Sequence, residues 1–168
     1  MDAKLAERLR QIALIGFDVD GVFTDGRFYL SDDGIESKTF HTQDGYGVRA
    51  LIRSGVSVAV VSGRRSAAVE HRMRELEVEH VVLGSRDKVQ DFAGLTQLLG
   101  LEAPQTAFVG DDLPDLPLLE AVGFSFAVAN AVDTLKNSTD YVTRRAGGAG
   151  AVREICDLLL AARAEDSA

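Results

Sequence analysis

The sequence lacks several features of secreted, zinc-binding and membrane-spanning proteins. Its 168 residues include one cysteine, Cys156, which excludes an internal disulfide and a four-cysteine zinc site. There is no His-x-x-x-His pattern, so we expect no zinc centre. No apolar run approaches the roughly 18 residues that a membrane-spanning helix needs. These absences favour a protein of a reducing compartment that makes no use of a membrane.

The distribution of charge also excludes some classes of partner. The first ten residues mix acidic and basic side chains, unlike a secretory signal peptide, and we therefore expect a cytoplasmic location. The formal net charge of -8 at pH 7 opposes binding to nucleic acid or to an anionic membrane, because both are themselves negative. An anionic ligand would need local basic groups or a metal ion.

Strand-like and helical segments alternate along the chain. Strands are predicted at Ile12–Phe17, Val56–Val61, His80–Leu83, Thr106–Val109, Phe124–Ala127 and Tyr141–Thr143. Helices are predicted at Tyr46–Arg53, Ala67–Leu76, Lys88–Leu99, Leu113–Ala121, Ala131–Asn137 and Ala151–Ala162. This alternation predicts one α/β domain over residues 1–168, with a doubly wound, mainly parallel, Rossmann-like sheet. The most continuous apolar segment, Val56–Val61, is typical of an interior strand.

Two segments depart from this alternation. Residues 27–40 contain two strand-like runs around Ser31-Asp32-Asp33-Gly34, which predicts a β-hairpin next to the end of the first strand. The glycine-rich stretch Gly147–Gly150 indicates a flexible C-terminal tail over about residues 144–168. Cys156 shares a helical apolar face with its neighbours, and we expect it in the core.

The first predicted strand ends in two carboxylates. Asp18 and Asp20 follow it, and Gly21 indicates that the chain turns there. Like charges this close need a partner, because otherwise one carboxylate would be driven to protonate. One interpretation is a solvated strand-to-turn junction, since Asp and Gly are ordinary turn residues. The other is a divalent-cation site in which an aspartate attacks phosphorus.

Polar residues follow three more predicted strands or begin the next helix: Ser62, Lys88, Asp111, Asp112 and Asp115. Ligands of open parallel sheets bind at the carboxyl ends of strands, so these residues are expected to converge. Taken singly, Ser62 is also a plausible helix N-cap, Lys88 a solvated lysine and Asp115 a helix-start carboxylate. The adjacent pair Asp111 and Asp112 adds charge to a site that Mg²⁺ would suit best, because its preferred ligands are hard oxygens.

The ordered set Asp18-x-Asp20, Ser62, Lys88 and Gly110-Asp111-Asp112-x-x-Asp115 resembles the four motifs of the haloacid dehalogenase-like phosphatase superfamily. Further segments resemble the 3-deoxy-D-manno-octulosonate 8-phosphate phosphatase family over nearly the whole chain: Phe17–Gly26, Phe40–Gly47, Val61–Arg64 and Gly150–Glu154. Nonulosonate 9-phosphate phosphatases share much of this pattern. The resemblance implies a Mg²⁺-dependent phosphomonoester hydrolase of lipopolysaccharide precursor synthesis.

The same resemblance implies roles for the acidic residues. Asp18 would be the nucleophile that forms an aspartyl-phosphate, and Asp20 would be the general acid and base. The side chains of Asp18 and Asp111 and the backbone carbonyl of Asp20 would hold Mg²⁺. Asp112 and Asp115 would surround these ligands.

It also implies how the substrate is bound. Ser62 and Lys88 would bind the phosphoryl oxygens. The expected contacts to the rest of the substrate are Gly63, Arg64, Arg72 and Asp44. The family has an arginine between the second and third tail glycines, where this chain has Ala149. Other arginines would then have to meet a substrate carboxylate, the candidates being Arg64, Arg72, Arg144, Arg145 and Arg153.

The spacing of the motifs leaves no room for a separate cap domain, because Arg65–Asp87 holds only one helix and one strand. The site is then open or closed by another subunit. The resemblance implies a homotetramer whose hairpins pack together and whose Gly147–Gly150 segment reaches a neighbouring site. Packing would cover the apolar side chains of the hairpin, which are Phe28, Leu30, Ile35 and Phe40.

Alternatives from other classes remain open on the sequence. A phospho-accepting receiver domain also combines an α/β sheet, an acidic cluster, a hydroxyl and a lysine. In a receiver the lysine comes last, whereas here Lys88 precedes the second acidic cluster. An inactive scaffold is a further alternative, although none of the expected catalytic positions is replaced.

Overall fold

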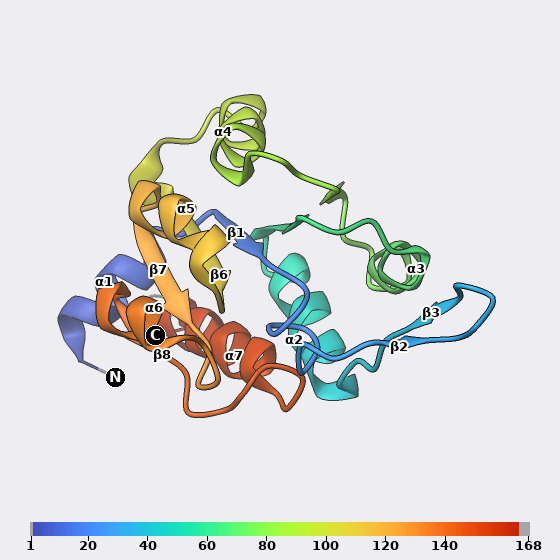
Figure 1. Cartoon of the computed structure of the whole chain (residues 1–168). Coiled ribbons are helices and arrows are strands. Elements are labelled where there is room, and N and C mark those ends of the chain that lie inside the picture. The colour runs from blue at the N-terminus through green and yellow to red at the C-terminus, as the bar shows by residue number, and fades with distance from the viewer. Residues whose placement is uncertain (1, 165–168) are drawn as a thin grey trace.

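Six parallel strands form the central sheet of the computed structural model, which describes residues 2–164 (Figure 1). The strands lie in the order β5-β4-β1-β6-β7-β8. Their bounds are β1 Leu14–Phe17, β4 Ser57–Ser62, β5 His80–Leu83, β6 Thr106–Gly110, β7 Phe124–Ala127 and β8 Tyr141–Val142. The predicted doubly wound parallel sheet is confirmed, and β4 is an interior strand as expected.

Helices cover both faces of this sheet. They are α1 Ala3–Arg10, α2 Thr42–Arg53, α3 Ala67–Glu75, α4 Lys88–Leu98, α5 Leu116–Ala121, α6 Asp133–Ser138 and α7 Ala151–Ala164, with short 3₁₀ turns η1 Ala103–Gln105 and η2 Leu113–Asp115. Figure 1 shows α1, α2 and α7 on one side of the sheet and α4 and α5 on the other. Over residues 2–164, no helix has both the length and the apolar character required to cross a membrane.

The two ends of the described chain differ from the sequence-based expectation. Helix α1 was not predicted, although Ala6 and Leu9 are spaced to share one face and are buried there. Within the expected flexible tail over residues 144–168, α7 carries a fully buried apolar stripe that includes Ile155 and Leu159. The flexibility of this segment stays a prediction. Cys156 is buried in the same stripe, as predicted. Residues 165–168 lie outside the described part of the chain.

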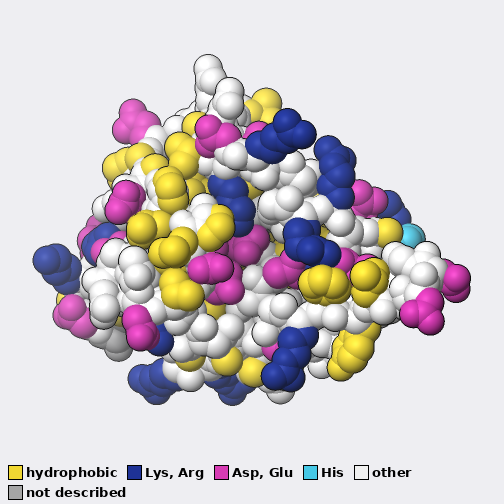
Figure 2. All heavy atoms as spheres, in the orientation of Figure 1, with side chains coloured by type: hydrophobic (Ala, Val, Ile, Leu, Met, Phe, Trp, Pro, Cys, Tyr) yellow, Lys and Arg dark blue, Asp and Glu magenta, His cyan; other side chains and the backbone are white. Residues whose placement is uncertain are grey.

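The predicted hairpin is confirmed as β2 Tyr29–Leu30 paired with antiparallel β3 Glu36–Ser37. Gly34 has a φ of +77° in its turn, and its N–H donates to the Ser31 carbonyl at 2.9 Å. The hairpin projects from the body of the molecule (Figure 1), and apolar side chains gather around it (Figure 2). Leu30 is 64% exposed, so the hairpin has apolar surface that its own chain does not cover. Between β4 and α4 lie only α3 and β5, and the described residues contain no cap domain.

Candidate active site

The turn after β1 is held tightly by backbone hydrogen bonds. The Asp18 N–H continues the strand ladder by donating to the Val109 carbonyl at 3.0 Å. The chain then closes one compact turn, in which the N–H groups of residues 22–24 all donate to the Val19 carbonyl. Gly21 has a φ of +90°, and an added Cβ there would clash with the Asp111 carboxylate. Glycine is therefore required at this position, both by the backbone conformation and by the approach of Asp111.

Three carboxylates converge at the carboxyl ends of β1 and β6. One oxygen each from Asp18, Asp111 and Asp115 can be chosen so that all lie within 4.8 Å of one another. Asp18 is 8% exposed and Asp115 is 1% exposed. Both oxygens of Asp115 are already bonded, one to Lys88 Nζ at 2.6 Å and the other to the Asp111 N–H at 3.1 Å. Asp115 thus braces the site, whereas no hydrogen-bond donor of residues 2–164 contacts the Asp111 carboxylate.

Lys88 is the cation of this cluster. As the first residue of α4 it lies next to Asp87, whose side chain caps the helix by accepting from the Gln90 N–H at 3.0 Å. Lys88 Nζ lies 2.9 Å from Asp18 Oδ1 and 2.6 Å from Asp115 Oδ1. Burial disfavours the ammonium, but the two carboxylates outweigh burial and raise the pKa of Lys88. The solvated-lysine interpretation is therefore wrong.

The remaining carboxylates have too little positive charge around them. Burial, followed by the negative charge of Asp115, raises the pKa of Asp18 to about 6, and Lys88 only partly opposes this. Burial, followed by the charges of Asp18, Asp115 and Asp112, raises the pKa of Asp111 to about 7. Near neutral pH, a cation held between Asp18 and Asp111 would therefore stabilise both in their charged forms.

Asp20 has different neighbours, which come from the hairpin and from the loop after β4. Lys38 Nζ donates to Asp20 Oδ1 and lies 3.6 Å from Glu36 Oε1. The Lys38 side chain is 1% exposed. Arg64 bridges the same pair, with Nε 3.7 Å from Asp20 Oδ2 and a terminal nitrogen 2.6 Å from Glu36 Oε2. Sequence reasoning missed Lys38 and Glu36, although it placed the hairpin near this end of the sheet.

Ser62 and Gly63 lie at the end of β4, next to β1. Ser62 is the last residue of the strand and is almost fully buried, and its Oγ accepts from the Arg64 N–H at 3.4 Å. The N-cap interpretation of Ser62 is wrong, because α3 begins later, with Ser66 at its N-cap position. The structure therefore brings together the strand ends that carry Asp18, Ser62 and Asp111.

Two predicted substrate contacts lie elsewhere. The buried Asp44 accepts the Arg153 N–H at 2.8 Å and so caps the start of α7, and burial raises its pKa. The predicted contact of Asp44 with substrate stays a prediction. Arg72 pairs with Glu75 at 2.8 Å on α3, and its predicted contact with substrate stays a prediction.

Asn130 connects the turn after β1, which holds Asp18 and Asp20 and is called the catalytic turn below, to the glycine-rich segment Gly147–Gly150. Its Nδ2 donates to the Gly21 carbonyl at 3.2 Å, and its Oδ1 accepts from the Gly147 N–H at 2.6 Å. The Gly148 N–H donates to the Val22 carbonyl at 3.1 Å. Within one chain this segment therefore packs on the catalytic turn of the same subunit. Nothing in the sequence distinguished Asn130 from an ordinary loop asparagine.

Known proteins resemble this chain in sequence and in fold. The model of the haloacid dehalogenase-like hydrolases matches residues 81–155. The 3-deoxy-D-manno-octulosonate 8-phosphate phosphatase KdsC of Escherichia coli K12 is 44% identical over 163 residues, which are 97% of this chain and 87% of that protein.

Solved structures agree with this relationship. The phosphatase of the same name from Yersinia pestis has a TM-score of 0.95 and 42% identity, with 98% of this chain and 89% of that chain covered. The one from Moraxella catarrhalis, solved with magnesium, phosphate and KDO, has a TM-score of 0.95 and 39% identity, with 99% and 96% covered. The chain therefore belongs to the 3-deoxy-D-manno-octulosonate 8-phosphate phosphatase family of haloacid dehalogenase-like hydrolases.

Proposed function

We propose that this protein is a Mg²⁺-dependent phosphatase that hydrolyses 3-deoxy-D-manno-octulosonate 8-phosphate through an aspartyl-phosphate intermediate. The observation that carries the reaction type is the position of Asp18. This carboxylate lies at the end of a central strand, 2.9 Å from Lys88 and within reach of Asp111. Family membership supports hydrolase chemistry and sets aside the receiver-domain alternative.

The donor atoms at the site fit Mg²⁺. The carboxylates of Asp18 and Asp111 are hard oxygen donors, and burial, followed by neighbouring negative charge, raises the pKa of both, which a bound cation would counter. We assign these two side chains, with the Asp20 carbonyl, as the ligands, because both oxygens of Asp115 are bonded within the protein. We place Asp112 in the shell of residues around these ligands, as we do Asp115. The Asp112 side chain accepts a hydrogen bond from the Leu113 N–H at 2.8 Å. When bound, Mg²⁺ would neutralise charge on the transferring phosphoryl group.

The two aspartates of the first motif divide the chemistry. An Asp18 oxygen attacks phosphorus, and the bond between phosphorus and the sugar oxygen breaks. Asp20 gives its proton to that leaving oxygen. In the second half, Asp20 takes a proton from the water that attacks the aspartyl-phosphate, and inorganic phosphate leaves with Asp18 restored.

Lys88 and Ser62 are positioned to hold the phosphoryl oxygens. The Lys88 ammonium already lies against Asp18, so it can neutralise charge as the phosphoryl group approaches that carboxylate. The Ser62 hydroxyl lies at the adjacent strand end and can donate a hydrogen bond. Positioning and neutralisation of charge are the main demands of phosphoryl transfer.

The identity of the substrate rests on the relatives and on the basic groups near Asp20. Arg64 lies beside Asp20 and stacks over Phe28, 4.3 Å from the ring centroid, so its guanidinium is directed along the hairpin. Arg64, with Gly63 beside it, is our candidate for contact with the sugar acid. The relatives carry the name of the 8-phosphate phosphatase, which favours that substrate over a 9-phospho-nonulosonate.

We extend the proposal to assembly and location. The exposed apolar hairpin supports a homotetramer in which hairpins pack together, because such a surface is costly in water. The unpaired Cys156 is consistent with a cytoplasmic enzyme. Light scattering at micromolar concentration tests the tetramer, and a monomer would contradict it.

A phosphate-release assay tests the function. We expect Mg²⁺-dependent turnover of the 8-phosphate, its loss with EDTA, and a fall of at least about 10⁴-fold in Asp18→Asn, because that variant lacks the nucleophile. Lys136→Met is the control, since within residues 2–164 the Lys136 side chain pairs only with the exposed Asp133 on α6. Preference for a 9-phospho-nonulosonate would replace the substrate but keep the reaction. Stoichiometric phosphorylation without turnover would overturn the proposal.

A further inference from the structure

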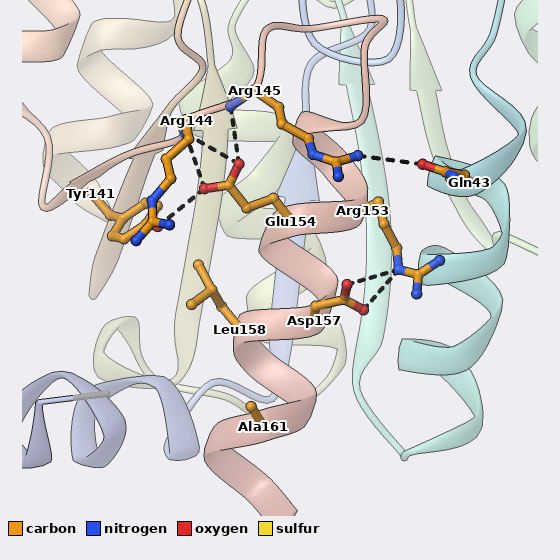
Figure 3. Close-up of a pocket in the computed structure, with 9 residues that line it drawn as sticks. All are labelled: Gln43, Tyr141, Arg144, Arg145, Arg153, Glu154, Asp157, Leu158 and Ala161. Carbon is orange, nitrogen blue, oxygen red and sulfur yellow. Dashed lines mark hydrogen bonds and ion pairs between the residues drawn. The ribbon is translucent and has the colours of Figure 1, made fainter.

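A hollow away from the carboxylate cluster lies against α7. It has a volume of about 600 Å³ and lies between the first turn of α2, the end of β8 and one face of α7 (Figure 3). Its polar lining comes mainly from three arginines, Arg144, Arg145 and Arg153, and two carboxylates, Glu154 and Asp157. None of these side chains belongs to the carboxylate cluster around Asp18.

Both carboxylates of the hollow already have partners. Glu154 accepts the backbone N–H groups of Arg144 and Arg145 at 3.0 to 3.1 Å and the Tyr141 hydroxyl at 3.1 Å. Asp157 holds Arg153 Nε with both oxygens, at 2.8 and 2.9 Å. Both acidic side chains of the hollow therefore have hydrogen-bond donors, and neither of them is bonded to the guanidinium group of Arg144 or Arg145.

The arginines retain most of their binding capacity. Among residues 2–164 the Arg144 guanidinium has no hydrogen-bond or ion-pair partner, and Arg145 makes only a 3.3 Å bond to the neutral Gln43 side chain. Arg153 uses Nε for Asp157 and places its guanidinium 4.8 Å from the Tyr46 ring centroid. The lining therefore has three positive and two negative charges, on a chain whose formal net charge is -8.

We propose that this hollow binds a small oxyanion, the phosphate or carboxylate group of a metabolite, between the Arg144 and Arg145 side chains. Guanidinium groups recognise both kinds of oxyanion through paired N–H donors. A volume of about 600 Å³ is in the range of sites for small organic ligands. In Figure 3 the side chains of Arg144 and Arg145 reach out from one short segment on opposite sides of Glu154, Arg144 toward Tyr141 and Arg145 toward Gln43, so a ligand held by both would lie across the start of α7.

Calorimetric titration of the EDTA-treated protein with inorganic phosphate tests the site. Without metal the catalytic cluster is dominated by carboxylates and repels anions, so binding under this condition reports the arginines. We expect metal-independent binding that is at least about tenfold weaker in the double variant Arg144→Gln/Arg145→Gln, because both charged hydrogen-bond donors to the anion are lost. The backbone N–H groups that bind Glu154 remain in this variant, and its urea midpoint, measured beside the wild type, checks that the fold is kept.

Two controls and a second probe make the result decisive. Arg53→Gln/Arg74→Gln removes the same charge from two other exposed arginines and should bind phosphate like the wild type. Ser62→Ala should also bind like the wild type. A parallel titration with the dephosphorylated sugar acid asks whether a carboxylate suffices, and this arm alone rests on the proposed function. Absence of binding by both probes, or equal binding by the double variant, or loss of binding in Ser62→Ala would overturn the proposal.

Discussion

Asp18 and Asp20 are two residues apart in the sequence but have opposite surroundings. Asp18 lies among the carboxylates of Asp111 and Asp115, with Lys88 as the cation in contact with it. Asp20 lies between two cations, Lys38 and Arg64, which share Glu36 as a further partner. The first environment has excess negative charge and the second is nearly balanced.

This difference shows how one short turn serves two roles. The carboxylate cluster is built on strand ends and helix starts of the sheet, and its excess negative charge favours a bound cation. The groups around Asp20 come largely from the hairpin, an insertion that lies outside the sheet. The sheet therefore provides the proposed nucleophile and metal site, while the hairpin provides the partners of the proposed acid and base.

Among the substitutions that test this comparison, loss of the Lys88 charge should change the free energy of unfolding most. Lys88→Met leaves Asp18 and Asp115 without their shared cation, and removing one partner of a buried ion pair typically costs about 3–5 kcal/mol. Urea unfolding of the metal-free protein should show a loss of this size in the free energy of unfolding. Addition of Asp115→Asn should recover part of it. Lys136→Met serves again as the surface control, and a Lys88→Met protein as stable as that control would contradict the buried pair.

The pH dependence of the metal-free protein should expose the unbalanced carboxylates. Asp111 and Asp18 titrate at about 7 and about 6 in the folded state, above their ordinary value of 3.8. Between about pH 4 and pH 7 the folded protein then binds more protons than the unfolded chain, so these groups make the free energy of unfolding fall as pH rises.

Asp111→Asn isolates this contribution. In EDTA the variant should be more stable than the wild type at pH 8 by roughly 1–3 kcal/mol, after allowance for solvent screening, and this difference should shrink as the pH falls to 5. With saturating Mg²⁺ the order at pH 8 should reverse, because the wild type then has the better ligand. Equal stability of the two proteins in EDTA at both pH values would show that burial and neighbouring carboxylates do not destabilise the ionised form of Asp111.

The sequence predicted the sheet, most helices and the converging strand ends because these depend on local periodicity and on a general rule for parallel sheets. It did not identify Lys38, Glu36 or Asn130, because their roles arise where the hairpin and a distant loop meet the catalytic turn. The bond between Asp44 and the Arg153 N–H was missed for the same reason, because the two residues are 109 positions apart in sequence. Long-range contacts between polar groups leave no period in a single sequence.

The hairpin side of the comparison can be tested with Lys38→Met. The substitution removes the charged hydrogen bond to Asp20, which corresponds to roughly 1.5–3 kcal/mol, or about 10–100-fold in activity. We expect kcat/KM for phosphate release to fall by that factor, with Mg²⁺ activation unchanged, because Lys38 contacts Asp20 and Glu36 rather than Asp18. A matching loss of Mg²⁺ affinity would show that the two environments are not separate.

The smallest expected effect concerns the link between the turn and the glycine-rich segment. Asn130→Ala removes the bonds to the Gly21 carbonyl and the Gly147 N–H, each worth roughly 0.5–1.5 kcal/mol, so the free energy of unfolding should fall by about 1–2 kcal/mol. Because Gly21 follows Asp20 directly and lies against the Asp111 carboxylate, kcat should also fall several-fold. Asn137→Ala, a change at an exposed position of α6, should leave both quantities unaltered. If stability falls but kcat does not, Asn130 only fastens the segment, and the position of the two aspartates is set by the turn itself.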